Sequence, residues 1–182
     1  MKIFLIRHGI TQGNLEKRYV GQSDIPLCEQ GIKELGGRQY PAVDAVYVSP
    51  LLRARQTAAL IYPQQEAIPV EKIKEIHFGI FENKHYHELR EYRPYQDWLD
   101  SRCTLPIPGG ESFAGFTKRC LEGFAEIIAM ARQAGWKRIA IVAHGGTIRS
   151  ILMTYVDATK GFYDWEIENG GVYEMEAPVC WK

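Results

Sequence analysis

Two short apolar stretches of this chain end in the same way, and this repetition constrains the fold more than any other feature. Residues 2–6 run directly into Arg7-His8-Gly9, and residues 138–143 run directly into His144-Gly145-Gly146. Each stretch has the length and composition of a buried β-strand. A single histidine after a strand is more often structural than catalytic. If the two strands are parallel neighbours, however, both imidazoles lie at the carboxyl edge of one sheet, where open α/β sheets bind ligands.

Strand-like and helix-like stretches alternate along the rest of the chain. Apolar runs predict strands, and apolar residues at helical spacing predict helices. The alternation predicts an α/β fold, a three-layer α/β/α sandwich with a mainly parallel sheet and an antiparallel strand near the end. The predicted elements are a helix from Cys28 past Leu35, a strand at 44–49, a helix from Pro50 to Tyr62, a strand at 68–70, a helix at 111–134, a helix after Gly146, and strands at 162–167 and 172–175 joined by a hairpin turn.

The length of 182 residues predicts a single domain over residues 1–182. Within it, residues 81–110 are rich in aromatic and histidine side chains. We interpret this segment as a lid-like insertion with one or two helices packed over a site. For most of its aromatic side chains, a satellite core that serves only stability is an equally good interpretation.

The charges of the chain balance, with 22 Lys and Arg against 22 Asp and Glu. No global field therefore favours nucleic acid or an anionic membrane as a partner, and any affinity for anions must be local. Arg7 and His8 interrupt the apolar N-terminus before a secretory signal could form. No run approaches the ~20 apolar residues that a membrane-spanning helix needs. We expect a cytoplasmic protein.

The cysteines show no paired spacing. The sequence has no CxxC motif and no zinc-like pattern, so free thiols in a reducing compartment are expected. No activating context for a cysteine nucleophile is visible, and the GxSxG elbow of serine hydrolases is absent. The four cysteines are Cys28, Cys103, Cys120 and Cys180.

Cations and hydrogen-bond donors gather at the predicted sheet edge. Arg7 and His144 each come directly after a predicted strand. Asn14 lies in the segment after Arg7, and Arg53 falls in the first turn of the predicted helix that follows the strand at 44–49. Gly145 lets backbone N–H groups approach a ligand, and the predicted helix after Gly146 directs its positive end at an anion. Together these groups form a cationic cup that suits a small phosphate ester, without a metal or other cofactor.

One imidazole of such a cup can attack phosphorus. A histidine nucleophile must be neutral, and neighbouring cations such as Arg7 and Arg53 oppose its protonation. His8, which lies between the arginine and the glycine, is the better candidate. The leaving alkoxide then needs a proton, and Glu75, at a strand end before an aromatic loop, is placed to supply it.

Four motifs in this order resemble those of the histidine phosphatase superfamily, the phosphoglycerate mutase-like enzymes. RHGITQGN resembles RHGxTxxN, SPLLRARQTA resembles SxLxRAxxTA, EIHFGIFE resembles the glutamate-containing stretch, and VAHGGTIRS resembles the second histidine motif. The resemblance covers nearly the whole chain. It implies that His8 is phosphorylated during turnover and that Glu75 is the proton donor. It further implies a phosphoryl-binding set of Arg7, Arg53, His144 and Asn14, and a pocket lined by Thr11, Gln22 and Ser23.

The chain departs from the family pattern at two places. Many relatives have an aromatic-Glu-Gly where this chain has Phe81-Glu82-Asn83, and Cys28 stands where Ser or Thr often caps the first long helix. Neither departure removes a catalytic group. Both bear on the shape of the substrate pocket.

The resemblance and the short chain favour hydrolysis over mutase activity, since a mutase must hold a bisphosphorylated intermediate and exclude water. The run PGGES at residues 108–112 resembles α-ribazole phosphatases, which remove the 5′-phosphate in cobalamin nucleotide-loop assembly. We therefore expect a metal-independent phosphomonoesterase, with α-ribazole 5′-phosphate as the first candidate substrate. A broad-specificity histidine acid phosphatase and a phosphoglycerate mutase are the alternatives.

Two other classes fit the sequence less well. A non-catalytic phosphate-binding module would keep the arginines but would not need His8, Glu75 and His144 together. A metal-dependent hydrolase would need ligands at recognisable spacing, which the histidines of the aromatic segment and their acidic neighbours lack. Those histidines are His77, His85 and His87.

Overall fold

The strands form one twisted sheet in which the first strand of the chain occupies an inner position. The computed structural model describes residues 1–178, and these residues form a five-stranded sheet in the order β3-β2-β4-β1-β5. Neighbouring strands run parallel except β5, which pairs antiparallel with β1. The strands are β1 (Lys2–Arg7), β2 (Ala45–Val48), β3 (Ala67–Pro69), β4 (Arg138–Ala143) and β5 (Val172–Glu176).

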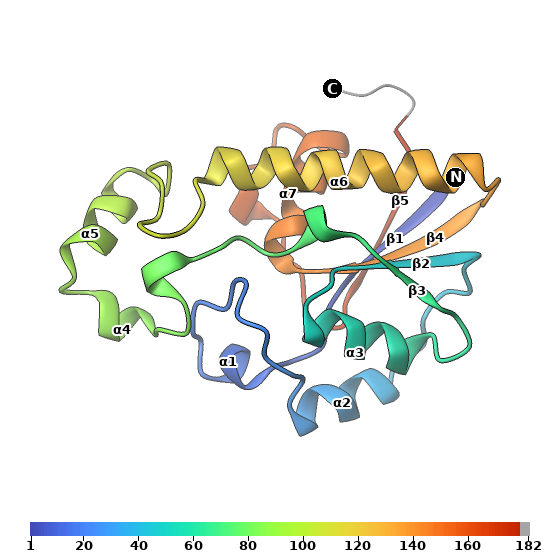
Figure 1. The fold of residues 1–182 in the computed structure, drawn as a ribbon, viewed down its shortest axis with the longest axis horizontal. Coiled ribbons are helices and arrows are strands. Elements are labelled where there is room, and N and C mark those ends of the chain that lie inside the picture. Colours follow the sequence, from blue (N-terminus) through green and yellow to red (C-terminus); the bar gives the residue numbers. More distant parts are fainter. Residues whose placement is uncertain (179–182) are drawn as a thin grey trace.

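Helices cover both faces of this sheet, with α6 and α7 on one face and α2 and α3 on the other (Figure 1). The predicted three-layer α/β fold with a mainly parallel sheet is thus confirmed. The helices are α1 (Gln12–Leu15), α2 (Glu29–Gly36), α3 (Leu52–Ile61), α4 (Tyr86–Leu89), α5 (Arg93–Asp100), α6 (Phe113–Gln133) and α7 (Gly145–Tyr155), with short 3₁₀ turns η1 (Glu71–Ile73), η2 (Gly79–Phe81) and η3 (Phe162–Asp164).

Both faces of β1 are buried, which explains why its sequence is continuously apolar. Successive side chains of a strand point to opposite faces. Ile3 and Leu5 pack in the cluster shared with α6 and α7, whereas Phe4 and Ile6 pack in the cluster shared with α3. Burying each such side chain contributes about 1.5–3 kcal/mol. This two-sided packing holds the strand rigidly, and the residues that follow it begin from a fixed point.

The long helix α6 begins and ends where its sequence predicts. The hydroxyl of Ser112 accepts a hydrogen bond from the N–H of Gly115 at 3.1 Å, which caps the N-terminus. Gly135 follows the C-terminus with φ +74°, a conformation that residues with a side chain adopt rarely. By contrast, α3 begins at Leu52 and not at Pro50, which precedes the capping residue.

The predicted strand at residues 162–167 is wrong. The segment contains η3 and irregular chain, and Trp165 and Ile167 are buried by packing against the main core cluster instead of by strand pairing. The turn at residues 168–171 is therefore not a hairpin. Gly170, with φ +69°, donates its N–H to the carbonyls of Arg7 and His8 at 2.9 and 3.2 Å. This turn closes the end of β1.

Residues 81–110 contain α4 and α5 and lie at one end of the molecule, beyond the sheet (Figure 1). Their apolar side chains join a third core cluster with residues of the neighbouring loop and of α6. Tyr19 reaches this cluster from the first loop, and its hydroxyl lies 2.7 Å from that of Tyr95. The members of the cluster are Ile76, Phe81, Leu89, Tyr95, Trp98, Ile107, Phe116 and Cys120.

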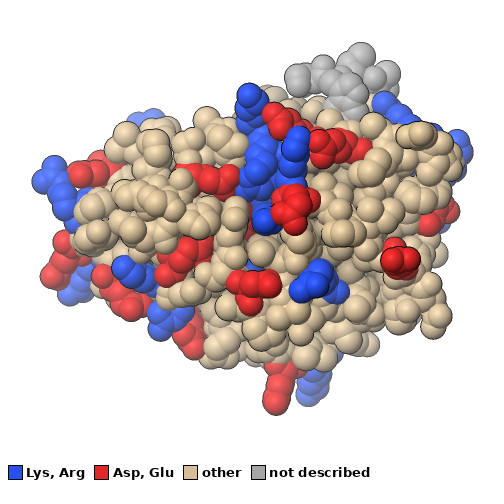
Figure 2. All heavy atoms as spheres, viewed as in Figure 1, with Lys and Arg blue, Asp and Glu red and all other residues tan. Residues whose placement is uncertain are grey.

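Opposite charges are interspersed on the face of the molecule shown in Figure 2. The ammonium of Lys72 lies 2.7 Å from Glu126 and 3.3 Å from Glu122, and that of Lys74 lies 2.5 Å from Glu71. Such exposed pairs each contribute little stability. They do neutralise one another, as the balanced composition predicts.

Within residues 1–178, no helix has the length and apolar character needed to cross a membrane. The thiols of Cys28, Cys103 and Cys120 are free. Cys180 lies outside the described residues.

Candidate active site

The register of β1 and β4 brings the two histidines together. Arg7 pairs with Ala143, so His8 and His144 each follow directly on adjacent strands. The N–H of His8 donates to the carbonyl of Ala143 at 2.9 Å, and the two imidazole centroids lie 5.2 Å apart. His8 is 4% exposed and His144 is fully buried.

The hydrogen-bond partners of His8 assign its tautomer. Nδ1 lies 2.7 Å from the carbonyl oxygen of Gly9, which can only accept, so Nδ1 carries the proton. Nε2 accepts a hydrogen bond from Nε of Arg53 at 3.3 Å. The lone pair of Nε2 therefore points toward the guanidinium of Arg53, which occupies it in this structure.

Both histidines are held in the neutral form. Burial, followed by the charges of Arg53 and Arg7, depresses the pKa of His8 well below its usual 6.5. Burial and the charge of Arg53 do the same to the pKa of His144. At neutral pH the site therefore contains two uncharged imidazoles beside two guanidinium groups.

Arg53 is fully buried, and its side chain is anchored to the first loop. Its Nη1 donates to the carbonyl of Ser23 at 2.9 Å and its Nη2 donates to the carbonyl of Gly21 at 2.6 Å. Burial lowers the pKa of the guanidinium, while the negative charge of Glu75 raises it. Arginine nevertheless keeps its charge in proteins. The result is a fixed cation in contact with His8.

Arg7 leaves part of its guanidinium available to a ligand. Its Nη1 donates to the carbonyl of Ile167 at 2.6 Å, which fixes the side chain against the chain that precedes β5. Its Nε and the Nδ1 of His144 are buried and have no hydrogen-bond partner among the described residues. Buried polar atoms of native proteins are nearly always paired. These two atoms are therefore suited to bind the oxygens of a ligand.

Glu75 lies across the site in the chain between η1 and η2. It is 9% exposed, and its Oε2 accepts from the N–H of Gly146 at 2.9 Å while its Oε1 accepts from the N–H of Ile76 at 3.0 Å. A Cβ at Gly146 would lie only 2.3 Å from Oε1 of Glu75. Glycine at this position thus allows the carboxyl group to approach the start of α7.

A cavity of about 360 Å³ opens beside Glu75 and Gly146. Among its described lining residues, Arg149 is the basic one, and its guanidinium lies 5.7 Å from the ring centroid of Phe162. Nε of Arg149 donates to the carbonyl of Trp165 at 2.9 Å. The remaining wall is largely aromatic and includes Tyr19, Phe78, Trp98, Phe113, Phe116, Phe162 and Tyr163.

Thr11 and Asn14, predicted to bind substrate, form a capping box at the start of α1. Oδ1 of Asn14 accepts from the N–H and from the hydroxyl of Thr11, each at 3.0 Å. It also accepts from Nδ2 of Asn169 at 3.2 Å, and the same amide donates to the carbonyl of His8 at 3.0 Å. The structure thus places both residues in the hydrogen-bond network that supports the backbone of His8.

Gln22 and Ser23, the other predicted lining residues, contact catalytic candidates through backbone groups. Nε2 of Gln22 donates to the carbonyl of Glu75 at 3.2 Å. Ser23 supplies the carbonyl that binds Arg53, and its hydroxyl donates to Glu82 at 2.8 Å. Direct contact of either side chain with substrate stays a prediction. Gly145, by contrast, lies against the guanidinium of Arg7, since a Cβ there would be 3.4 Å from Nε.

Sequence reasoning missed several residues of this region. The hydroxyl of Ser49 lies 2.7 Å from Nε2 of His144, and Ser49 directly follows β2. The strand-end rule that singled out His8 applies to Ser49 as well. No comparable signal marked Asn169 or Arg149, because tertiary packing brings both to the site.

The histidines considered as metal ligands do not gather at the site. The rings of His85 and His87 stack on the exposed start of α4, whereas Nδ1 of His77 accepts from the N–H of Gly79. Among residues 1–178, no group of three or more His, Cys, Asp or Glu side chains is arranged to hold a metal ion.

The fold and the site define the class. This is an α/β protein of the phosphoglycerate mutase-like fold, with two neutral histidines, the buried Arg53 and the partly buried Arg7 at the carboxyl edge of its sheet. Residues 3–178 match the family described as "Histidine phosphatase superfamily (branch 1)", and the chain belongs to this superfamily. The resemblance inferred from the four motifs is confirmed.

Similar proteins include named phosphatases. The chain is 34% identical over 172 residues to the metal-independent phosphoserine phosphatase of Arabidopsis thaliana, covering 87% of this chain and 70% of that protein. It is 31% identical over 196 residues to the adenosylcobalamin/alpha-ribazole phosphatase of Escherichia coli, covering 100% and 88%. The crystal structure of the alpha-ribazole phosphatase from Shigella flexneri superposes with a TM-score of 0.84 at 26% identity, covering 98% and 92%. The prediction of a phosphoric monoester hydrolase is confirmed.

Proposed function

We propose that this protein is a metal-independent phosphomonoesterase that acts through a phosphohistidine at His8, with α-ribazole 5′-phosphate as its substrate. The observation that carries the mechanism is the state of His8. It is buried and neutral, with its proton fixed on Nδ1 by Gly9 and its Nε2 lone pair beside Arg53. A neutral imidazole held in this orientation is an activated nucleophile.

In the first step, Nε2 of His8 attacks phosphorus, the N–P bond forms and the bond to the ester oxygen breaks. The departing oxygen takes a proton from the carboxyl group of Glu75. The phosphorylated imidazole keeps its proton on Nδ1 and becomes positively charged, and the carbonyl of Gly9 stabilises that charge at 2.7 Å. Glu75 is ionised at the end of this step.

In the second step, Glu75 accepts a proton from water as the water oxygen attacks phosphorus. The N–P bond breaks, inorganic phosphate leaves and His8 returns to its neutral form. The guanidinium groups of Arg7 and Arg53 and the unpaired Nδ1 of His144 bind the equatorial oxygens, on which charge is spread in the transition state.

The mechanism is tested with His8→Ala and Glu75→Gln. The first variant should lose turnover while it retains its fold by circular dichroism. The second should lose roughly 10²–10⁴-fold in kcat with alkyl phosphates but much less with p-nitrophenyl phosphate, because only the alkoxide needs a proton. Turnover by His8→Ala would exclude the nucleophile assignment, and equal losses on both esters would remove Glu75 from its role.

The aromatic lining of the cavity supports an ester whose alcohol part carries an aromatic group. Its largely aromatic wall adjoins Glu75, so the alcohol part of the ester would lie against Phe78, Phe116 and Phe162. A nucleoside phosphate with a planar base, such as α-ribazole 5′-phosphate, would bury apolar surface there and stack on the rings. The similarity to α-ribazole phosphatases agrees with this choice.

Arg149 favours a second candidate, a broad-specificity phosphatase that also accepts small carboxylated esters. A guanidinium at the cavity wall can bind a carboxylate, and the relative from Arabidopsis thaliana is a phosphoserine phosphatase. A mutase is less well supported. It must bind a second phosphate in this cavity, where the described lining residues offer a single basic side chain.

Substrate choice is tested by steady-state hydrolysis in the presence of EDTA. The panel holds α-ribazole 5′-phosphate, phosphoserine, 3-phosphoglycerate, sugar phosphates, nucleotides and p-nitrophenyl phosphate. A kcat/KM for α-ribazole 5′-phosphate at least tenfold above all others supports the first candidate. Similar values across the panel support the second, and isomerisation of 3-phosphoglycerate without hydrolysis would refute both.

A further inference from the structure

The residue proposed as the acid is carried on a segment with no regular secondary structure. Residues 74–78 connect η1 to η2 without a helix or strand, and Glu75 is the second of them. A general acid must stay within hydrogen-bond reach of the leaving oxygen, and a displacement of 1 Å can cost about 100-fold in rate. Some other part of the molecule must therefore hold this segment in place.

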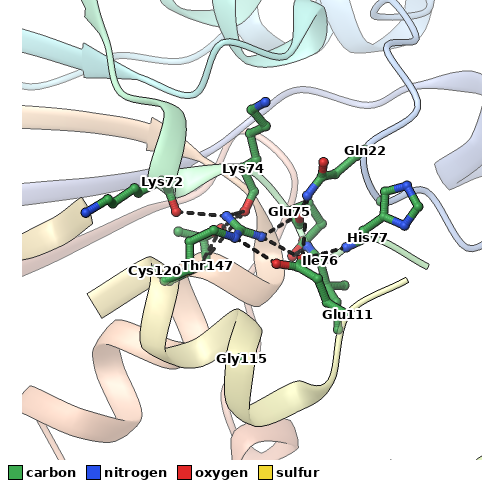
Figure 3. A network of polar contacts seen from close by, with 12 residues as sticks. Gln22, Lys72, Lys74, Glu75, Ile76, His77, Glu111, Gly115, Cys120 and Thr147 are labelled. Atoms are coloured by element: carbon green, nitrogen blue, oxygen red, sulfur yellow. Dashed lines mark hydrogen bonds and ion pairs between the residues drawn. The ribbon is translucent and has the colours of Figure 1, made fainter. Parts of the chain in front are cut away.

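Arg119 of α6 provides most of that support. Its Nη1 donates to the carbonyls of Lys72 and Lys74 at 2.8 and 3.0 Å, and its Nη2 donates to the carbonyl of Glu75 at 3.2 Å. One guanidinium thus binds three carbonyls on the chain that leads into and includes Glu75. Figure 3 draws this network of polar contacts and labels Lys72, Lys74 and Glu75.

Glu111 orients Arg119 and binds the other side of the segment. Nε and Nη2 of Arg119 donate to the two carboxylate oxygens of Glu111 at 2.8 and 2.7 Å. The same carboxylate accepts from the N–H of His77 at 2.9 Å, and Gln22 donates to the carbonyl of Glu75 at 3.2 Å (Figure 3). Hydrogen bonds therefore hold the backbone before Glu75, at Lys72 and Lys74, and after it, at His77.

The pair stays charged although it is partly buried. Burial is the largest influence and opposes ionisation of both groups. Their mutual hydrogen bonds, the N–H of His77 on Glu111 and the surrounding charges together outweigh it, so the pKa of Glu111 is lowered and the pKa of Arg119 is raised. A two-point contact between a guanidinium and a carboxylate is geometrically specific. Lysine has a single ammonium group and cannot reproduce the planar fork.

Neither Arg119 nor Glu111 lines the cavity beside Glu75, and both lie on an adjoining surface groove with Gln22 and His77. They reach the reaction only through the backbone that carries the acid. We propose that Arg119 and Glu111 are positioning residues that hold the carboxyl group of Glu75 against the N–H of Gly146 and toward the leaving oxygen. This inference rests on the role proposed above for Glu75.

The experiment varies the leaving group of the substrate, which separates a misplaced Glu75 from a general loss of folded structure. Arg119→Gln, Arg119→Lys and Glu111→Gln are compared with Lys118→Ala, an exposed cation on the same helix. Each is assayed with an alkyl phosphate and with p-nitrophenyl phosphate, and its melting temperature is measured. We expect Arg119→Gln to lose roughly 10- to 100-fold in kcat with the alkyl ester and less than about threefold with the aryl ester. Lys118→Ala should match the parent chain on both.

A double-mutant cycle with Glu75→Gln completes the test. If Arg119 acts through the acid, Arg119→Gln should cause little further loss in a chain that already lacks it. Equal losses on the two esters, or full additivity with Glu75→Gln, would overturn the inference. Arg119→Lys should lose kcat with the alkyl ester as Arg119→Gln does. Recovery of the alkyl-ester rate by lysine would contradict a role for the two-point contact between Arg119 and Glu111.

The two proposals fail in distinguishable ways. If Glu75→Gln loses the same factor in kcat with the alkyl and the aryl ester, the role proposed for Glu75 is wrong, whatever the Arg119 variants show. If Glu75→Gln loses more kcat with the alkyl ester than with the aryl ester and Arg119→Gln does not, the assignment of Glu75 as the acid stands and the positioning role of Arg119 is refuted.

Discussion

The neutral state of the buried histidines has a measurable effect on stability, which we develop for His8. In the unfolded chain its imidazole takes up a proton near its usual pKa of 6.5, whereas the folded chain resists protonation until the pH is well below that value. Below pH 6.5 the unfolded state therefore binds more protons, and the free energy of unfolding falls as the pH falls. The stabilisation is fully present above pH 6.5.

The magnitude follows from linkage. For one histidine that remains neutral when folded, the free energy of unfolding should drop by about 1.4 kcal/mol between pH 7.5 and 5.5. His144 is depressed for the same reason, so the pair should account for about 2.7 kcal/mol over this range. That is a large fraction of the stability of a typical domain.

The assay is urea unfolding at 25 °C at several pH values between 7.5 and 5.5, for the parent chain, His8→Gln and His144→Gln. Titrations common to all three chains cancel in the differences between them. Each variant should lose about 1.4 kcal/mol less than the parent over this range. An identical pH dependence in parent and His8→Gln would mean that His8 takes up a proton in the folded chain as readily as in the unfolded chain, and the lowered pKa of its imidazole would be refuted.

Three further predictions concern other parts of the molecule. Gly146→Ala should displace Glu75, whose Oε1 lies 2.3 Å from the added Cβ, and lower kcat for alkyl phosphates roughly 10- to 100-fold. Its melting temperature should also fall, because the added Cβ would lie 3.1 Å from the ring of the fully buried Phe116; an unchanged rate with alkyl phosphates would contradict the displacement of Glu75. Cys28→Ser should strengthen the cap of α2, where a thiol now accepts from the N–H of Gly31 at 3.4 Å, by about 0.5–1 kcal/mol, or roughly 1–4 °C in thermal unfolding. Prolonged dialysis against EDTA should leave phosphatase turnover unchanged, and restoration of lost activity by a divalent cation would refute the metal-independent mechanism.

The pairing of His8 with His144 could be predicted because it depends on two local facts. Each histidine follows a buried apolar strand, and parallel strands end at one edge of a sheet. The same reasoning applied to Ser49 would have found the partner of His144. Features that depend on strand ends are therefore accessible from sequence.

The wrong strand at residues 162–167 shows where this reasoning stops. The apolar side chains of Trp165 and Ile167 are buried, as in a strand, but by contact with a core that forms from other parts of the chain. Periodicity reports burial and not the partner that causes it. Asn169 and Arg119 escaped notice for a related reason, since their contacts join residues far apart in sequence.

Asn83 illustrates a departure from the family pattern that the structure explains. Its φ is +60°, the left-handed conformation that glycine adopts at least cost and asparagine better than most other residues. The side chain of Asn83 offsets part of the cost of this backbone conformation, because its Nδ2 donates to the hydroxyl of Ser23 at 3.0 Å. Asparagine thus meets, in this chain, a backbone requirement for which glycine is the least costly residue.

The inner position of β1 has a consequence for how the protein is made. β1 is the earliest strand in the chain, yet its sheet partners, β4 and β5, lie far along it. During synthesis β1 has neither of these partners until most of the chain has left the ribosome, and an unpaired apolar strand is prone to aggregation in that interval. When it finally inserts between β4 and β5, His8 is desolvated and placed beside His144 in one event. A chain that lacks β4 therefore cannot form the arrangement in which the proposed nucleophile, His8, lies buried beside His144.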